Sequence, residues 1–527
     1  MSFPENWWSA SPSYVSEILS LFAAEPDRDV AYWRGEAFSG GDLIQSVTES
    51  FLTLQNCGVG KGDVVAILVE PNSPEMLTVR YATYLLGGAV CYLRTTNPGT
   101  NAAVLPPDQQ IQILRDTEAV TIYADAENSE RALELADGTG IPVTRLHHGE
   151  CNEVSPLDVP ALPDAASWDP DALVFISFSS GSTGRPKGIR SSARAWQGVL
   201  RAFMDLGHES DCASVLLSTP LSHAGAPMAD AAFILGGAIY LHESFDAETF
   251  VQTVSAKKEV SWTFMATTHV FQLIDYLHER GIRDRAAVEA AGLSSLKRIV
   301  YGGSPAAPVR TKQAFRTFGP VMVQWYASGE SYQITTLRPS EHGDPELAAT
   351  VGRPYPGVEV VVCNSDSGEQ LAVGEIGEIR VRSPQLMDGY TGDPELTARA
   401  LRDGWYFTGD IGFFNDRGYL TLVGRVADVI KVDGVKVHPT VVEAEILSHP
   451  GVRHAAVYGV RDEDGGEHIH AAVECDPNEA VDAEDIRARI TAALSSIHAP
   501  EKINFLSALP MNSIGKPDRV LLRSQYV

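Results

Sequence analysis

The sequence predicts an α/β protein with a large N-terminal domain and a small α+β C-terminal domain. From about Asp29 to Arg145, short runs rich in β-forming residues alternate with helix-like stretches, which is typical of a parallel sheet with crossover helices. After about Gly374 the pattern changes to short strands and turns. The segment from Asp428 onward contains both strand-like and helix-like runs, so we expect a compact unit there, with a boundary near residues 424–428.

The individual elements follow from hydrophobic periodicity and from turn residues. Strands are predicted over residues 64–69, 173–178, 297–301 and 321–325, and helices over residues 107–116 and 482–496. The strands predicted over residues 173–178, 297–301 and 321–325 each run into a turn that contains glycine or serine. Because ligands of open α/β sheets gather at the carboxyl ends of strands, we expect the functional site at these turns.

The composition is that of a folded, acidic protein. The chain has 527 residues, of which 44% are hydrophobic and 21% are charged, so it can bury more than one domain-sized core. Its formal net charge of -27 argues against sequence-independent binding of nucleic acid, which needs a basic face. We therefore expect an enzyme with small-molecule partners and no nucleic acid. A homodimer is expected only from the general frequency of dimers.

A cytoplasmic location is predicted from three features. The six cysteines are scattered without a C-x-x-C pair, which favours a reducing compartment. The first residues have neither the basic start nor the apolar stretch of a secretory signal. The most apolar window, Met228 to Leu241, is interrupted by Asp230 and is too short to cross a bilayer, so we expect a buried core element there and no membrane span.

A phosphate-binding loop is predicted directly after the strand at residues 173–178. Its residues are Ser179, Ser180, Gly181, Ser182, Thr183, Gly184, Arg185, Pro186, Lys187 and Gly188. Glycines let the backbone approach an anion, hydroxyls donate hydrogen bonds to phosphate oxygens, and Lys187 adds a cation. A Walker loop is excluded, because Pro186 and Gly188 flank the lysine where that motif needs a glycine and a hydroxyl. A plain glycine- and serine-rich surface loop is the alternative.

This segment resembles the signature loop of the adenylate-forming superfamily, which includes acyl-CoA synthetases, peptide-synthetase adenylation domains and beetle luciferases. Similar segments follow in the family's order from about residue 170 to the end, and the chain is most similar to an acid:CoA ligase. The resemblance implies a large domain over residues 1–424, with mostly parallel sheets, flanking helices and a small β-barrel-like part. It also implies a hinge over residues 425–428 and a small, mobile C-terminal domain over residues 429–527.

Two further turns resemble the family's adenine-binding segments. Residues 301–305 are similar to a glycine turn that lies against adenine, although a simple tight turn is the alternative. Residues 324–330 are similar to the family's Q-x-Y-G-x-T-E segment, in which Tyr326 would stack on adenine and Glu330 would hold a magnesium ion bridging ATP phosphates. The nucleotide-binding residues expected in these turns are Gly303, Ser304, Pro305, Gln324, Trp325, Tyr326, Ser328 and Gly329.

Three charged residues near the C-terminus match positions with assigned roles in the family. Asp410 lies three residues after the aromatic run Trp405-Tyr406-Phe407, at the end of the predicted strand, and would accept hydrogen bonds from both ribose hydroxyls. Arg425, in a Gly-Arg pair, would lie near the ribose and phosphate. Lys516, within a loop that starts at Pro510, matches the catalytic lysine. Each of them alone would more often be an ordinary solvated residue, so the prediction depends on the whole set.

The resemblance implies a two-step reaction. The carboxylate of an acid would attack the α-phosphate of ATP, and magnesium pyrophosphate would leave; positioning and charge neutralisation supply most of such catalysis. Lys516, Glu330 and Lys187 are the expected catalytic residues, with Glu330 as the metal ligand. The acyl group would then pass to CoA, the expected cosubstrate, with Lys431 and Gly434 on the acceptor side.

The sequence departs from the family at three positions. Gly329 replaces a threonine whose hydroxyl contacts the α-phosphate, so that contact is absent or replaced, with Ser328 as a candidate. Ala427 stands where the family's hinge has Asp or Lys, and Thr267 stands where the family usually has proline. We therefore expect an unusual, rather polar acid pocket. The prediction of thioester formation has less support from the sequence than the prediction of adenylation. The residues predicted to line the acid pocket are His223, Thr268 and Gly302.

Two alternatives remain open at the level of sequence. In the first alternative the adenylation step is kept and the later chemistry differs. The enzyme would adenylate an unusual acid such as nitrite and use an aryl amine as acceptor, in an ATP-dependent diazotisation, or it would transfer the acyl group to a carrier protein. A non-catalytic nucleotide-binding protein is an alternative of another class. The presence of Lys516, Glu330, Asp410 and Arg425 argues against it. A serine hydrolase is excluded because no G-x-S-x-G segment occurs.

Overall fold

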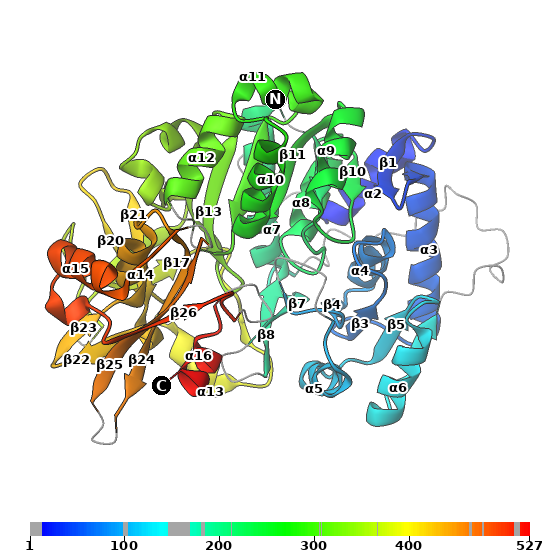
Figure 1. Cartoon of the computed structure of the whole chain (residues 1–527). Coiled ribbons are helices and arrows are strands. Elements are labelled where there is room, and N and C mark those ends of the chain that lie inside the picture. Colours follow the sequence, from blue (N-terminus) through cyan, green and yellow to red (C-terminus); the bar gives the residue numbers. More distant parts are fainter. Residues whose placement is uncertain are drawn as a thin grey trace. The chain divides into compact units, whose positions relative to one another are not determined.

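The fold is seen in a computed structural model that divides into two compact units (Figure 1). The described residues are 13–97, 104–145, 169–180, 185–211, 213–304, 306, 308–365, 367–462, 466–476, 479–510 and 517–526. The first unit comprises residues up to Ala348 together with 355–358 and 382–406. The second unit comprises residues 349–354, 359–381 and 407–527.

The first sheet of the first unit has the strand order β14-β13-β12-β11-β9-β10-β1-β2. Its strands are β1 (Asp29–Trp33), β2 (Glu36–Ser39), β9 (Ser214–Leu217), β10 (Ile239–Leu241), β11 (Val260–Ala266), β12 (Arg298–Gly302), β13 (Met322–Ser328) and β14 (Tyr332–Leu337). Neighbours from β1 to β13 pair in parallel, and β2 and β14 pair antiparallel at the edges. The carboxyl ends of β11, β12 and β13 therefore lie at one edge, where the sequence predicts the adenine turns.

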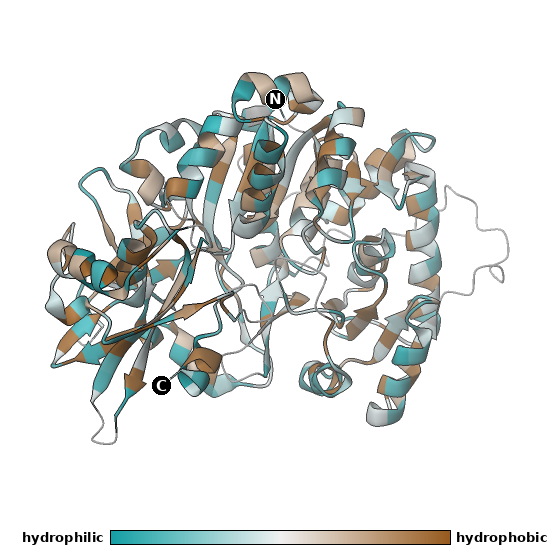
Figure 2. Ribbon diagram, in the orientation of Figure 1, coloured by the Kyte–Doolittle hydropathy of each residue, from teal (hydrophilic) through white to brown (hydrophobic). Residues whose placement is uncertain are grey.

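The second sheet of this unit has the order β18-β8-β7-β4-β3-β5-β6. Its strands are β3 (Val64–Leu68), β4 (Ala89–Tyr92), β5 (Thr121–Ala124), β6 (Val143–Arg145), β7 (Leu173–Ser180), β8 (Pro186–Ser192) and β18 (Gly389–Tyr390). Every residue of β3 is buried, as expected for a continuous apolar strand in a parallel sheet covered on both faces. Figure 2 shows the hydrophobic colouring along β3, whereas helix α3 (Gly40–Asn56) carries both colours.

Helices cover both sheets. The remaining helices of this unit are α2 (Tyr14–Ala24), α4 (Glu75–Leu85), α5 (Pro107–Thr117), α6 (Ser129–Thr139), α7 (Ala193–Ser210), α8 (Gly225–Ile234), α9 (Ala247–Ala256), α10 (Thr267–Glu279), α11 (Arg285–Val288), α12 (Pro308–Phe318) and α13 (Pro394–Ala400). One hydrophobic core joins residues of both sheets with α7 and α8, including Phe175, Trp196 and Val323. Separate cores hold α9, α10 and α12 on the first sheet and α5 and α6 on the second.

The apolar window predicted over Met228 to Leu241 comprises most of helix α8 and, after a turn, strand β10. Helix α8 is a buried core element, as predicted. All of its residues are buried, including Asp230, whose carboxylate accepts hydrogen bonds from the Arg80 guanidinium at 2.6 and 2.9 Å and from the Tyr81 hydroxyl at 2.5 Å. The buried charge is thus paired and hydrogen-bonded, as an apolar surrounding requires. Among the described residues, no helix has the length and apolar character needed to cross a membrane.

The second unit contains small, mostly antiparallel sheets and three α-helices in its described part. Its elements are β16 (Glu359–Cys363), β17 (Gly377–Arg382), β20 (Trp405–Phe414), β21 (Leu420–Arg425), β22 (Ile430–Val432), β23 (Val435–Val437), α14 (Pro439–Leu447), β24 (Val452–Arg461), β25 (Glu467–Cys475), α15 (Ala483–Ala493), β26 (Lys502–Leu506) and α16 (Arg519–Gln525). An apolar core packs α14 and α15 on β24 and β25. The large parallel-sheet domain and smaller C-terminal domain confirm the predicted fold class, while the limits 1–424, 425–428 and 429–527 stay a prediction.

Candidate active site

The predicted phosphate loop connects two antiparallel strands of the second sheet. In the hairpin formed by β7 and β8, Ser179 lies opposite Lys187 and Ser180 lies opposite Pro186. Lys187 is half-buried, and its backbone lies at the base of the loop. Gly181, Ser182, Thr183 and Gly184 lie outside the described residues. The structure therefore positions both arms of the predicted loop at the carboxyl end of β7.

The glycine turn after β12 is close-packed. A side chain at Gly302 would place its Cβ 2.5 Å from the Trp325 carbonyl oxygen, and Gly303 has a φ of +84°, which favours glycine. The hydroxyl of Thr267, at the start of α10, lies 3.2 Å from the Gly302 carbonyl and 3.0 Å from that of Ser304. Thr267 is buried and holds the backbone of the turn, while Pro305 lies outside the described residues.

The residues after Thr267 differ in their surroundings. Thr268 is exposed, whereas His269 is half-buried and stacks on Phe245 with ring centroids 4.5 Å apart. Burial lowers the pKa of His269 to about 4, so its imidazole is neutral at pH 7. The three residues of the predicted polar segment therefore differ. The buried Thr267 hydroxyl binds backbone carbonyls, the Thr268 side chain is exposed, and the His269 imidazole is neutral and stacked.

Strand β13 alternates between two faces of its sheet. The Gln324 side-chain oxygen accepts a hydrogen bond from the buried Tyr301 hydroxyl at 3.2 Å. Trp325 is buried against Phe203, with ring centroids 4.7 Å apart, and Tyr326 is also buried. Gln324 and Trp325 thus pack β13 into the sheet, which fixes the position of the turn that follows.

That turn contains the chain's departure from the family motif. The Ser328 hydroxyl lies 2.9 Å from the Ser331 hydroxyl and accepts the Ser331 N–H at 3.2 Å. A Cβ at Gly329 would lie 2.6 Å from the Ile189 side chain of β8. Ile189 therefore occupies space that a threonine at position 329 would need, and Ser328 is engaged within its own turn.

The carboxylate of Glu330 lies beside Tyr390 of β18. The Tyr390 hydroxyl donates to Oε1 of Glu330 at 2.9 Å, and the Glu330 carbonyl accepts the Met387 N–H at 2.8 Å. Glu330 and Tyr390 are both half-buried. Sequence reasoning missed Tyr390, because it lies sixty residues after Glu330 in a two-residue strand with no motif of its own.

His223 joins the phosphate strand to the loop before α8. Its Nε2 lies 3.1 Å from the Phe178 carbonyl of β7, and its Nδ1 lies 2.9 Å from the Ser222 hydroxyl. A carbonyl only accepts, so Nε2 carries the proton and Nδ1 accepts from Ser222. Burial lowers the pKa of His223 to about 4, and the neutral ring cannot pair with an acid's charge at pH 7.

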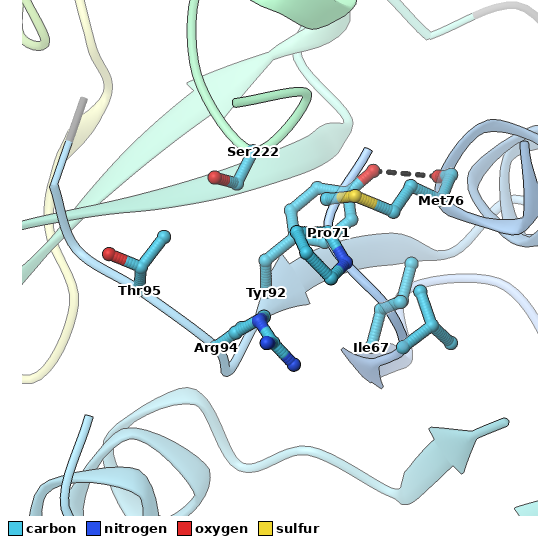
Figure 3. A pocket seen from close by; sticks show the side chains of 8 residues that line it. Ile67, Pro71, Met76, Tyr92, Arg94, Thr95 and Ser222 are labelled. Carbon is cyan, nitrogen blue, oxygen red and sulfur yellow. Dashed lines mark hydrogen bonds between the residues drawn. The ribbon is translucent and has the colours of Figure 1, made fainter. Parts of the chain in front are cut away.

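A small cavity is lined in part by Ser222 (Figure 3). The side chains of Arg94 and Thr95 line it together with Pro71, and the Tyr92 hydroxyl donates to the Met76 carbonyl at its edge at 2.8 Å. Its volume is about 10 Å³, which is room for roughly one water molecule. The cavity is therefore too small to be the acid pocket.

The predicted ribose-binding pair is formed in the second unit. Asp410 of β20 lies opposite Arg425 of β21, and Nε of Arg425 donates to Oδ1 of Asp410 at 3.0 Å. The Thr408 hydroxyl accepts the Asp410 N–H at 3.0 Å. The Arg425 side chain is 63% exposed and that of Asp410 is 15% exposed, so this ion pair faces solvent on the arginine side.

The predicted acceptor-side residues lie in the hairpin of β22 and β23. Asp433 and Gly434 form its two-residue turn, with φ values of +47° and +82°. These values match a type I′ turn, which suits glycine at the second position. The Lys431 N–H donates to Glu467 at 2.7 Å, and Lys516 lies outside the described residues.

Comparison with known proteins identifies the family. Residues 21–391 match the model of the AMP-binding enzyme family, and residues 441–516 match that of the AMP-binding enzyme C-terminal domain. The chain belongs to the AMP-binding enzyme family.

Relatives of this AMP-binding enzyme are acid–CoA ligases. A 2-succinylbenzoate–CoA ligase of Geobacillus kaustophilus is 31% identical over 88% of this chain and 88% of its own length. A medium/long-chain-fatty-acid–CoA ligase of Mycobacterium tuberculosis is 26% identical over 98% of this chain and 90% of its own length. Among solved structures, the amide bond synthetase McbA of Marinactinospora thermotolerans has a TM-score of 0.83 and 30% identity, covering 98% of this chain and 99% of its own. The resemblance to adenylate-forming enzymes is confirmed, and the chain is an AMP-forming ligase.

Proposed function

We propose that this AMP-binding enzyme activates a small carboxylic acid as an acyl-adenylate, releases pyrophosphate and passes the acyl group to CoA. The observation that supports it best is the joint packing of the β7–β8 phosphate hairpin and the Glu330 turn within one unit. The acid–CoA ligase relatives support CoA as acceptor. A cytoplasmic location stays part of this proposal.

In the first step the acid's carboxylate oxygen attacks the α-phosphate of ATP and the bond to pyrophosphate breaks. The acid is already ionised, so no general base is needed. The arms of the hairpin around Ser179 and Lys187 hold the phosphates, Asp410 and Arg425 bind the ribose side, and Lys516 bridges the attacking oxygen and the α-phosphate. Charge neutralisation and positioning lower the barrier of such a transfer.

Glu330 is the proposed ligand for Mg²⁺. Among the described residues, no three His, Cys, Asp or Glu side chains gather to form a metal cluster. Magnesium bound with a nucleotide commonly uses one or two protein carboxylates together with substrate phosphates and water. A single half-buried carboxylate next to a phosphate hairpin fits that ion. When bound, it neutralises charge on the ATP phosphates.

The acid pocket is proposed around His223, Thr268 and Gly302. Because the imidazole of His223 is neutral and both its nitrogens have protein partners, it would contribute shape to the pocket and no positive charge. A small aryl, acrylic or short-to-medium aliphatic acid is the proposed substrate class.

An amine acceptor is the second candidate for the later step. It is favoured by the similarity to an amide bond synthetase over nearly the whole chain, and by Ala427 at the position where the family's hinge has a charged residue. An amine attacking the adenylate would give an amide and AMP. With nitrite as the activated acid, an aryl amine would instead be diazotised.

The test separates the two steps. The pure protein is incubated with ATP, Mg²⁺ and a panel of acids that includes nitrite, and pyrophosphate is followed with CoA, with an amine, or with neither. Thioester formed only with CoA supports the ligase. If an amide or diazo product forms and no thioester does, the acceptor is an amine and not CoA. Absence of pyrophosphate release from every acid would contradict the proposed function.

A further inference from the structure

Strand β18 joins the two parts of the proposed phosphate site. The residues that flank β18 bond to the phosphate hairpin. The Asp388 N–H donates to the Arg190 carbonyl and the Thr391 N–H donates to the Gly188 carbonyl, both at 2.8 Å. The same short segment binds the turn after β13 through the Met387 N–H to the Glu330 carbonyl, also at 2.8 Å. Residues 387–391 therefore hold the hairpin and the Glu330 turn in one fixed arrangement.

The backbone of Tyr390 is itself well anchored. It lies opposite Ile189 in the antiparallel pair of β18 and β8, and its N–H donates to the Thr397 hydroxyl of α13 at 2.8 Å. A phenol on such an anchored backbone points in a defined direction. Its hydroxyl reaches Oε1 of Glu330 at 2.9 Å.

Glu330 needs such an anchor because Gly329 precedes it. Glycine leaves the backbone conformationally permissive, and no side chain at position 329 packs to hold the turn. The nearest atom to a Cβ there would be the Ile189 side chain, at 2.6 Å, so a larger residue would require Ile189 to move. Besides the Ser328–Ser331 contacts within the turn, Glu330 is held from the β18 segment by the Met387 N–H on its carbonyl and the Tyr390 hydroxyl on its carboxylate.

We propose that Tyr390 is a positioning residue, whose hydroxyl orients the Glu330 carboxylate toward the Mg²⁺ of bound ATP. This inference rests on the proposed function, in which Glu330 holds the ion. Carboxylates that bind metals are commonly oriented by a second hydrogen-bonded group, and loss of that group weakens metal binding.

Tyr390→Phe removes the hydroxyl alone, and Tyr355→Phe is the matched control. The Tyr355 hydroxyl also donates to a carboxylate, Oδ2 of Asp205 at 2.7 Å. Asp205 belongs to α7 and is not among the proposed site residues. Any general cost of losing a tyrosine–carboxylate hydrogen bond appears in both variants.

The measurement is binding of a non-hydrolysable ATP analogue by calorimetry as Mg²⁺ is titrated, with thermal unfolding of each protein alongside. We expect Tyr390→Phe to raise the Mg²⁺ concentration for half-maximal binding by roughly tenfold, with Mg²⁺-free binding unchanged. Tyr355→Phe should keep the wild-type Mg²⁺ dependence even if its unfolding temperature falls as far as that of Tyr390→Phe.

Glu330→Gln separates failure of this inference from failure of the proposed function. A shift in the Mg²⁺ dependence for Glu330→Gln but not for Tyr390→Phe overturns the positioning role alone. No shift in either variant overturns the Mg²⁺ role of Glu330 as well. A shift that Tyr355→Phe shares equally would also overturn the inference, because it would then reflect stability and not position.

Discussion

Two arginine–aspartate pairs of this chain have the same chemistry and opposite surroundings. Arg80 and Asp230 are fully buried between helices α4 and α8, with their nearest nitrogen and oxygen 2.6 Å apart. Arg425 and Asp410 pair across strands β20 and β21 at 3.0 Å, with the arginine side chain 63% exposed. Both oxygens of Asp230 are used by protein donors, including the Tyr81 hydroxyl, whereas the second pair is open to solvent on its arginine side.

The difference teaches that burial, and not the pair itself, separates an ion pair closed within the core from one that a ligand can reach. A buried pair broken on one side leaves an uncompensated charge in the core, while an exposed pair contributes little to stability. We therefore expect Asp230 to matter for folding and Asp410 for binding, although the two aspartates have similar partners.

The largest expected effect is that of Asp230→Ala. Arg80 would remain buried without its counter-charge, and the free energy of unfolding should fall by about 3–5 kcal/mol. Denaturant unfolding of the wild type and of Asp230→Ala measures this difference in the free energy of unfolding. A loss below about 1 kcal/mol would show that Arg80 finds solvent or another partner, and would remove the contrast between the two pairs.

Asp410→Ala should have the opposite effects, with a large loss of ligand binding and a small loss of stability. Loss of the carboxylate that is proposed to bind both ribose hydroxyls should weaken AMP binding by roughly ten- to a hundredfold, as expected for hydrogen bonds to a charged group. The free energy of unfolding should change by less than about 1 kcal/mol, because the arginine of the ion pair is exposed and solvent can hydrate it when the aspartate is removed. Calorimetric AMP titration and denaturant unfolding test both statements, and unchanged AMP affinity would contradict the ribose role.

Thr267 lies between these extremes, as a buried hydroxyl that holds a turn next to the proposed site. Thr267→Val should destabilise the protein by about 1 kcal/mol and weaken AMP binding several-fold, because the Gly302 and Ser304 carbonyls lose their donor. Thr267→Ser keeps the hydroxyl and should restore both quantities. If Thr267→Ser behaves like Thr267→Val, methyl packing and not the hydrogen bond would hold the turn.

The smallest effect is the contribution of His223 to pH dependence. Its pKa is lowered from 6.5 to about 4 in the folded protein by burial, so the unfolded chain binds more protons between these values. The contribution of His223 to stability is therefore complete above pH 6.5 and is lost as the pH falls toward 4. His223→Asn should show a shallower fall than wild type over that range in unfolding experiments. Identical slopes would mean that His223 titrates normally in the folded state.

Local pattern was sufficient to predict much of the fold. The strand predicted at residues 64–69 is β3, the helix at residues 107–116 is α5, and the strand at residues 173–178 is the start of β7. The C-terminal helix predicted over residues 482–496 is shorter, Ala483–Ala493. These elements follow from side-chain periodicity and turn residues, which are properties of neighbours in sequence.

The site could be predicted only where a motif lies within one segment. The hairpin with Ser179 and Lys187 is such a case. The contacts of Thr267 with Ser304, of Ile189 with Gly329 and of Tyr390 with Glu330 join residues on different strands and helices. Such contacts depend on sheet order and packing, and no local pattern encodes them.

Adenylation of an acid is the first step proposed for this chain. Acid-dependent exchange of labelled pyrophosphate into ATP tests it most directly, because it reports the first step whatever the acceptor is. We expect exchange in the wild-type protein with at least one acid of the panel, and its loss in Lys516→Ala although that variant stays folded. Equal exchange in Lys516→Ala, or none with any acid in the wild-type protein, would contradict the account.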